Sequence, residues 1–512
     1  MSARYSMSYL RTKANEFLNS RKYANNLADI LQMFEAETEN YSPLLLTVEV
    51  IFSELLKRGD LIQEIIPLKP AGIPEAVYTK WLRECYETAL SRCLSCITCG
   101  NSNSRIQALV SVCKLMQAEG KYPLEKSAGY YFPSVRLKNI FAVLLDSEQS
   151  MSAQIGRFQE FTEYRDVQQY GLKALSSMAY RKSPSPTYMQ NYLELMDKLL
   201  VLEIPTESKP KGKDDDEKEE KILCATEDKT TFPYNPLVCR RYANRCWGFA
   251  CQWALCSEPR TQRRALLLLV HRLMPLLTRP ALATDMIADT LDAGGPMSML
   301  ALQGLLELIR HHNIEYPDIY DRLYAMFEPE MFATRYKKRL IHLADVFLSS
   351  THLPEGLVAA FAKRLSRLAL VASPDDAASL LQLIGNLLLR HPGLKRMICR
   401  DPTPTIMSSD PYIMEETCAQ KSQALESMLW EVAALRRHHA PDVCSRADTV
   451  LNNIDARAVK SEILLKISDF LMLIFDAELK RRFKTIELNF ARPQGFAAAS
   501  GERLSQYWQL MA

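Results

Sequence analysis

The chain of 512 residues is 47% hydrophobic, so it can bury a large core, distributed over about two to four domains. Its 63 basic and 60 acidic residues leave a formal net charge of +3, which excludes an electrostatic clamp on nucleic acid formed by the whole protein. Only 17 glycines occur and helix-forming residues dominate, which favours an all-helical class over a β-rich one.

No apolar run approaches the roughly 20 residues that a membrane-spanning helix needs. Residues 1–17 mix charged and polar side chains too early for the apolar segment of a signal peptide. We therefore expect a soluble intracellular protein. Its 13 cysteines should stay reduced, because the cytosol and the nucleus disfavour disulfides and an odd number cannot pair completely within one chain.

Residues 15–202 have the pattern of consecutive helical hairpins. Apolar stripes broad enough to pack on two neighbours occur within 44–56, 81–97, 106–116 and 135–145. Turn signals separate these stripes at a spacing that suits a HEAT-like stack, whose repeats are about 40 residues long. No sequence motif repeats along the chain, so this prediction rests on the hydrophobic pattern.

The composition changes at Pro205. The segment PTESKPKGKDDDEKEEK, residues 205–221, is nearly free of apolar side chains and rich in both charges, so burial cannot offset the entropy of ordering it. We predict a flexible charged linker over 205–235 that acts as a solvated spacer. The alternative is a nuclear import signal built from the lysines of this segment, which the acidic run 214–216 would partly neutralise.

Helical patterning resumes at Leu237 and continues without a visible boundary to Val443. Residues 263–277 are apolar almost all round, so we expect this helix to be central. The predicted domains are HEAT-like repeats over 1–204, the linker over 205–235, a helical domain over 236–455, and a C-terminal helix and tail over 456–512.

Residues 316–398 carry the clearest helix signals of the chain. From Tyr336 to Phe347 the apolar residues recur at steps of three and four, which places them on one helical face. A second stripe, 357–368, follows a proline suited to a first helical turn. The sequence Ser-Pro-Asp-Asp at 373–376 then combines a capping hydroxyl, a proline and two carboxylates that the helix dipole favours, which predicts a third helix.

Several segments between residues 342 and 443 have distinctive sequences. They are HLADVFLSSTHLPEGLVAAFAKRLSRLAL (342–370), NLLLRHPGLKRMI (386–398), SSDPY (408–412), ALESMLWEVAAL (424–435) and HHAPDV (438–443). In these segments, and more weakly over 477–490, the chain resembles the CCAAT-binding-factor/Mak family of nucleolar proteins. The specific part of the resemblance spans 316–443.

The resemblance implies a non-enzymatic subunit of the small-subunit processome, located in the nucleus, within the nucleolus. Such a subunit would form a heterodimer with a larger nucleolar Nop-type protein. It would serve small-subunit rRNA processing and the maturation or export of the pre-ribosomal particle, with or without direct contact to rRNA.

The cysteines offer the most tempting signal for a metal site. Cys93, Cys96 and Cys99, with Cys85 nearby, have a spacing at which thiolates can hold zinc or an iron–sulfur cluster. They lie, however, within a predicted apolar helix that lacks the usual loop and a second pair of ligands, and buried free cysteine behaves as a small hydrophobe. We therefore expect these cysteines to serve packing and predict no metal site.

Catalytic motifs are missing from the sequence. It contains no G-x-S-x-G, P-loop, G-x-G-x-x-G or H-E-x-x-H pattern. The adjacent histidines at 311–312 and 438–439 would point about 100° apart on a helix and could not readily share one metal ion. We expect neither catalytic residues nor a cofactor.

Basic clusters are the better signal for binding. Two of them lie on consecutive predicted helices and would present one ridge toward phosphates or an acidic partner, and a third lies near the last helix. The ordinary alternative is a solvated helix face with snorkelling side chains. The candidate partner or RNA contacts are Lys337, Lys338, Arg339, Lys363, Arg364, Arg367, Lys480, Arg481, Arg482 and Lys484.

These patterns together predict an all-α, HEAT/armadillo-like α-solenoid, and with the resemblance they indicate a scaffold in ribosome biogenesis. The alternative is a transport-type helical-repeat adaptor that binds protein cargo without rRNA; it differs in that pre-ribosomal particles would not co-purify. An enzyme assembled from distant residues is a further class, which requires perturbed titratable groups that converge in a cleft.

Overall fold

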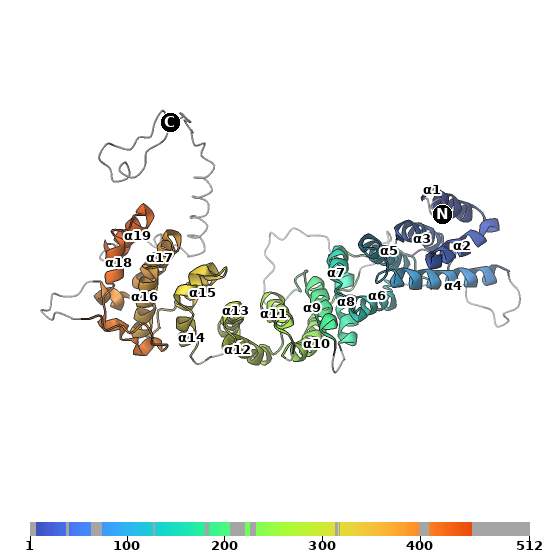
Figure 1. Ribbon diagram of the computed structural model, residues 1–512. Coiled ribbons are helices and arrows are strands. Elements are labelled where there is room, and N and C mark those ends of the chain that lie inside the picture. Colours follow the sequence, from blue (N-terminus) through green and yellow to red (C-terminus); the bar gives the residue numbers. More distant parts are fainter. Residues whose placement is uncertain are drawn as a thin grey trace, which may run out of the picture. The chain divides into compact units, whose positions relative to one another are not determined.

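The computed structural model describes residues 7–452, apart from 37–39, 63–73, 126–128, 180–183, 205–220, 226–231, 256, 313–315, 317 and 399–408. The described residues form α-helices joined by loops and by short 3-10 or π turns, and no β-strand occurs among them (Figure 1). The predicted all-helical repeat solenoid is confirmed. By its internal contacts the chain divides into two compact units, unit 1 (Met1–Glu315) and unit 2 (Tyr316–Ala512).

Unit 1 is built of helices that stack in two series. Odd-numbered helices contact the next odd-numbered helix from α1 to α13, and even-numbered helices do the same from α2 to α10. Each helix therefore packs mainly on near neighbours in the sequence, which is the local order of a helical-repeat protein. The helices are α1 Met7–Asn19, α2 Asn25–Ala36, α3 Ser42–Arg58, α4 Pro74–Ser95, α5 Ser102–Lys121, α6 Ser134–Asp146, α7 Ser152–Phe158, α8 Arg165–Met178, α9 Pro186–Leu199, α10 Pro236–Leu255, α11 Pro259–Leu268, α12 Thr284–Asp292 and α13 Gly295–His312.

Helix α3 shows why these sequences form a stack. Its predicted apolar stripe, from Leu44 to Leu56, is buried, and it contacts both α1 and α5. Proline occupies the first turn of the helix, and Gly59 ends it in the left-handed region (φ 78°), which glycine adopts without strain. Helix α5 begins at an N-cap, where the Asn101 side chain accepts a hydrogen bond from the Ser104 backbone N–H at 2.8 Å.

The predicted central helix over 263–277 is not one regular α-helix. Helix α11 ends at Leu268, a π-helical turn follows over Leu269–Leu273, and a 3-10 turn completes the segment over Met274–Leu276. Pro275 lies in the last turn and has no backbone N–H to continue an α-helix, which accounts for the change of winding. The segment is largely buried, as expected from its composition.

The predicted linker contains an anchored segment. Backbone N–H groups of Leu223 and Cys224 donate to the Asp166 carboxylate at 3.1 and 3.0 Å, and both side chains are buried. The Cys224 thiol occupies the space that Gly120 of α5 leaves free. The prediction of a solvated spacer over the whole of 205–235 is therefore wrong at these residues; 205–220 and 226–231 lie outside the described residues.

Helices from both sides of this segment belong to unit 1, because α10 contacts both α8 and α9. The boundary between the compact units falls instead at Glu315 and Tyr316. The four predicted domain ranges stay predictions about functional parts of the chain, and the predicted C-terminal helix and tail over 456–512 lie outside the described residues.

Unit 2 contains the three helices that the sequence predicts within 316–398. They are α15 Lys337–Phe347, α16 Glu355–Ala369 and α17 Pro374–Arg390, and the Ser373 hydroxyl caps α17 at the Asp376 backbone N–H. The unit also contains α14 Ile319–Ala325, α18 Trp430–Leu435 and α19 Pro441–Asn452. Within the part of the chain that the structure describes, no helix is both long and apolar enough to cross a membrane.

We expect Gly120→Ala to destabilise unit 1. A helical Gly→Ala change ordinarily stabilises by up to about 1 kcal/mol, but here the new Cβ would lie 2.7 Å from Cys224 Cβ. Chemical denaturation should show a free energy of unfolding lower by about 1–3 kcal/mol. The control is Gly156→Ala in α7, where a Cβ would meet nothing within 4 Å. A Gly120→Ala variant as stable as the control would contradict this packing of residues 221–225.

Candidate functional site

Helix α16 carries three of the predicted contact residues, and it is buried on nearly all sides. Its apolar stripe packs on α17, and its opposite face lies under two 3-10 turns, η8 (Ala419–Ser422) and η9 (Ala424–Glu426), and under α18. Residues 409–435 therefore cover the face that the helical wheel assigns to solvent.

Lys363 is the most deeply buried of the predicted contacts, with a fully inaccessible side chain. Its ammonium lies 2.9 Å from Asp410 Oδ2 and 2.7 Å from Glu431 Oε1. It also donates to the Met428 carbonyl oxygen at 2.6 Å. Carboxylates and a carbonyl thus replace the hydration shell that a buried ammonium loses.

Arg367, one turn further along α16, completes this group. Its Nη2 lies 2.7 Å from Asp410 Oδ2, and its Nε lies 2.6 Å from Glu431 Oε1. Two cations from α16 therefore face two carboxylates from the covering segment, so the formal charges cancel. We call Lys363, Arg367, Asp410 and Glu431 the α16 charge cluster.

The Asp410 carboxyl shows how strongly this cluster favours the charged state. Burial on its own would raise the pKa of Asp410. Hydrogen bonds from the Ser427 hydroxyl, the Lys363 ammonium and the Trp430 indole outweigh that effect and hold the pKa well below its ordinary value of 3.8.

Arg364 joins α16 to a different part of unit 2. Its side chain is 7% exposed, and its Nε donates to the Phe327 carbonyl oxygen at 2.7 Å. Its Nη1 donates to the Met414 carbonyl oxygen at 3.1 Å, and its guanidinium lies 4.4 Å from the centre of the Tyr324 ring. These contacts bind the guanidinium to other residues of unit 2.

The predicted basic ridge therefore does not exist on α16. Lys363 and Arg364 are buried and Arg367 is held by carboxylates, because residues distant in the sequence cover this face. On α15, Lys337 pairs with Asp376 at 2.7 Å, and Lys338 is exposed. The other predicted contacts are Arg339, which is half-buried, and Lys480, Arg481, Arg482 and Lys484, which lie outside the described residues.

Trp430 is held in place by the α16 charge cluster and yet remains 46% exposed. Its indole N–H donates to Asp410 Oδ2 at 3.0 Å. The Lys363 ammonium and the Arg367 guanidinium lie 5.4 and 4.9 Å from the ring centre, which is within cation–π range. Met428 is 40% exposed, and its carbonyl is bound by Lys363. We call the exposed side chains of Met428 and Trp430 the Trp430 surface.

Reasoning from single residues missed Asp410, Trp430 and Glu431. A signal for them was present, because all three lie in the segments SSDPY and ALESMLWEVAAL on which the resemblance rests. Those segments pair with α16 across a long stretch of sequence, which neither hydrophobic periodicity nor local charge pattern reveals.

The candidate metal ligands lie in different surroundings. Cys93 and Cys96 are buried and Cys99 is exposed. Burial raises the pKa of the Cys93 thiol far above its ordinary value and that of Cys96 to about 11, so both favour the protonated form. No group of three or more His, Cys, Asp or Glu side chains able to hold a metal ion occurs in the described part of the chain.

The stacked helices define this molecule as a helical-repeat protein. Residues 298–447 match the model of the CBF/Mak21 family, and residues 7–184 match that of the TPR repeats of nucleolar complex protein 4-like proteins. The chain is 33% identical to nucleolar complex protein 4 homolog A of Xenopus laevis, over 98% of this chain and 95% of that protein. Identity to the human nucleolar complex protein 4 homolog is 32%, covering 96% of each chain, and identity to Saccharomyces cerevisiae nucleolar complex protein 4 is 27%, covering 90% of this chain and 87% of that one.

The chain therefore belongs to the nucleolar complex protein 4 family. It is accordingly a nucleolar protein with a role in ribosome biogenesis, and the predicted family and location are confirmed. The family is not known as a family of enzymes.

We predict that Asp410→Asn lowers the free energy of unfolding at neutral pH by about 2 kcal/mol, because it removes charged hydrogen bonds. The pKa of Asp410 is lower in the folded protein than in the unfolded chain. Its contribution to the free energy of unfolding is therefore fully present above the pKa of the unfolded chain, and it is lost as the pH falls through the pKa of the folded protein. The deficit of the variant should therefore shrink as pH falls below 3.8. Urea unfolding of both proteins at several pH values measures this difference in the free energy of unfolding.

The matched control for this prediction is Asp448→Asn. Asp448 pairs with Arg436 on the surface, with its side chain 45% exposed, and such pairs contribute little. If Asp410→Asn unfolded like this control at every pH, the α16 charge cluster would not stabilise unit 2.

Proposed function

We propose that the chain is a non-enzymatic scaffold subunit of the small-subunit processome. In this role it binds a larger nucleolar Nop-type protein and keeps it in place during small-subunit rRNA processing and pre-ribosome maturation or export. The N-terminal repeats and the CBF/Mak21 region contribute separate binding surfaces to this task.

The observation that carries the proposal is the Trp430 surface. An exposed tryptophan would ordinarily sample several rotamers, and a partner would have to restrict them on binding. Here the indole N–H is bound to Asp410 and the ring lies over two cations, so the side chain is already ordered before the partner arrives. Ordered tryptophans are frequent anchors of protein interfaces.

The states of the nucleophilic and charged groups support a binding role rather than catalysis. The buried thiols favour their protonated, unreactive form, since burial raises the pKa of Cys85 and Cys96 to about 11. The charged groups of the α16 charge cluster contact one another and leave no charge directed at a substrate. A group poised for general acid–base chemistry would instead have its pKa near neutrality.

The test is affinity capture of tagged wild-type protein and of Trp430→Ala from cells. We expect the wild type to bring down a larger nucleolar protein together with small-subunit precursor rRNA. Trp430→Ala should recover at least about tenfold less of that protein, since truncating an interface anchor typically costs about 2 kcal/mol or more of binding free energy.

Leu282→Ala is the control, because Leu282 is another large apolar side chain, 73% exposed, and belongs to unit 1, whereas the Trp430 surface belongs to unit 2. Circular dichroism and thermal melting should show that both variants remain folded. Equal capture by wild type and Trp430→Ala would remove this surface from the proposal. Capture of a cargo protein without precursor rRNA by the wild type would instead favour the transport-type adaptor.

A further inference from the structure

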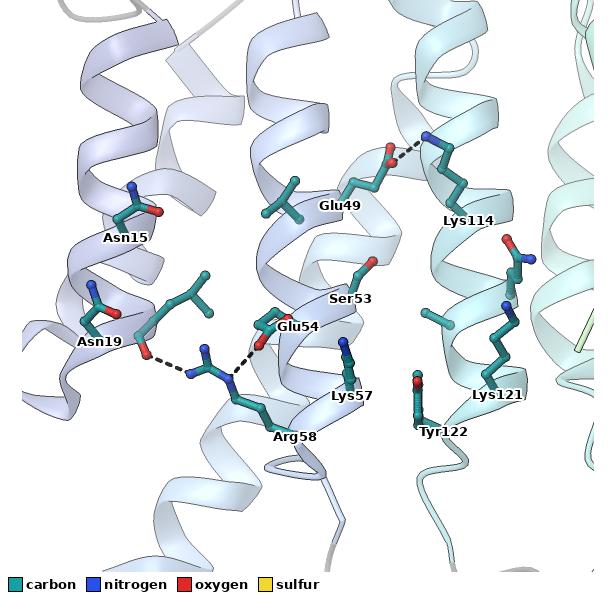
Figure 2. A pocket seen from close by; sticks show the side chains of 14 residues that line it. Asn15, Asn19, Glu49, Ser53, Glu54, Lys57, Arg58, Lys114, Lys121 and Tyr122 are labelled. Carbon is teal, nitrogen blue, oxygen red and sulfur yellow. Dashed lines mark hydrogen bonds and ion pairs between the residues drawn. The ribbon is translucent and has the colours of Figure 1, made fainter. Parts of the chain in front are cut away.

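A groove of about 710 Å³ lies between helices α1, α3 and α5 of unit 1 (Figure 2). Its volume falls in the range of pockets that hold a small ligand or part of a larger one. Patterns within single helices do not predict this groove, because its walls come from three different helices.

Basic side chains outnumber acidic ones on the walls of the groove. Lys114 lies 2.7 Å from Glu49 and Arg58 lies 2.9 Å from Glu54, so these four charges cancel in pairs. Two further lysines line the groove, Lys57 in the last turn of α3 and Lys121 in the last turn of α5. Neither has an ion-pair partner among the residues that the structure describes, so the groove carries a net positive charge.

An aromatic ring and amide groups accompany the two lysines. Tyr122, at the end of α5, is 37% exposed, and Figure 2 shows it between Lys57 and Lys121. Asn15 and Asn19 of α1 line the opposite side and are exposed. The groove therefore offers two cations that have no ion-pair partner in the described part of the chain, one aromatic ring for stacking, and uncharged hydrogen-bonding groups.

We propose that this groove binds single-stranded RNA, with phosphates on Lys57 and Lys121 and a base stacked on Tyr122. Single-stranded nucleic acid is bound by cationic grooves that also offer aromatic rings for stacking, and amides can bond to base edges and ribose hydroxyls. An acidic peptide would use the lysines but leave the ring and the amides without a role. The choice of RNA rests on the proposed function in ribosome biogenesis.

The test uses the purified full-length chain and a labelled oligouridine RNA of about 12 nucleotides, a length within the usual site sizes for such grooves. Fluorescence anisotropy at salt concentrations between about 50 and 200 mM gives both the affinity and its salt dependence. We expect the double substitution Lys57→Glu, Lys121→Glu to raise Kd at least about tenfold and to lower the slope of log K against log salt by about 1.4, for two lost phosphate contacts.

The matched control is Lys138→Glu, Lys173→Glu, which changes the net charge equally at exposed lysines of α6 and α8 outside the groove. It should bind RNA as the wild type does. Tyr122→Ala should raise Kd about tenfold without changing the salt slope, and Tyr122→Phe should restore binding, because stacking needs the ring and not the hydroxyl.

Equal loss of affinity in both lysine pairs would show that binding is non-specific and would overturn the proposal. So would displacement of the RNA by an equal concentration of polyglutamate, which would assign the groove to an acidic peptide. Because only synthetic RNA is used, failure here would leave capture of a nucleolar protein through the Trp430 surface intact, and the two proposals can fail separately.

Discussion

A buried lysine that must be neutralised is the constraint on which the arrangement of unit 2 depends. Lys363 has no contact with solvent, so the unit is stable only while Asp410, Glu431 and the Met428 carbonyl surround its ammonium. Leaving such a buried charge without compensation typically costs about 3–5 kcal/mol, a large fraction of the stability of a domain. The ammonium thus helps to fix the position of the segment over 409–435 on α16, together with the apolar side chains that this segment buries.

The same contacts connect stability to binding. Asp410 accepts hydrogen bonds from Lys363 and from the Trp430 indole, so the residue that neutralises the core also orients the exposed ring. Unit 1 is ordered mainly by a different route, since each of its helices packs on near neighbours in the sequence. Its groove arises where the ends of helices α3 and α5 bring basic side chains together beside α1. One unit therefore offers an ordered aromatic side chain and the other a basic hollow.

Periodicity in the sequence predicted the helices well because each apolar stripe is local. The stripes of α3, α15, α16 and α17 are buried where they were expected, and the Ser373 cap forms. Contacts distant in the sequence were not predictable in this way. Lys363 resembles a solvated lysine on its helical wheel, because the carboxylates that bury it lie 47 and 68 residues later, in stretches without strong periodicity. Leu223 and Cys224 likewise follow a highly charged run, and only the Asp166 carboxylate and the space at Gly120 explain why they are buried.

The most direct test of this account is amide hydrogen exchange in wild-type protein and in Lys363→Met, which keeps an unbranched side chain only one atom shorter and removes its charge. If the ammonium holds the covering segment on α16, exchange over 409–435 should accelerate by at least about a hundredfold, the equivalent of about 3 kcal/mol, while helices α1 to α9 keep their protection. Unchanged protection over 409–435 in the variant would contradict the account.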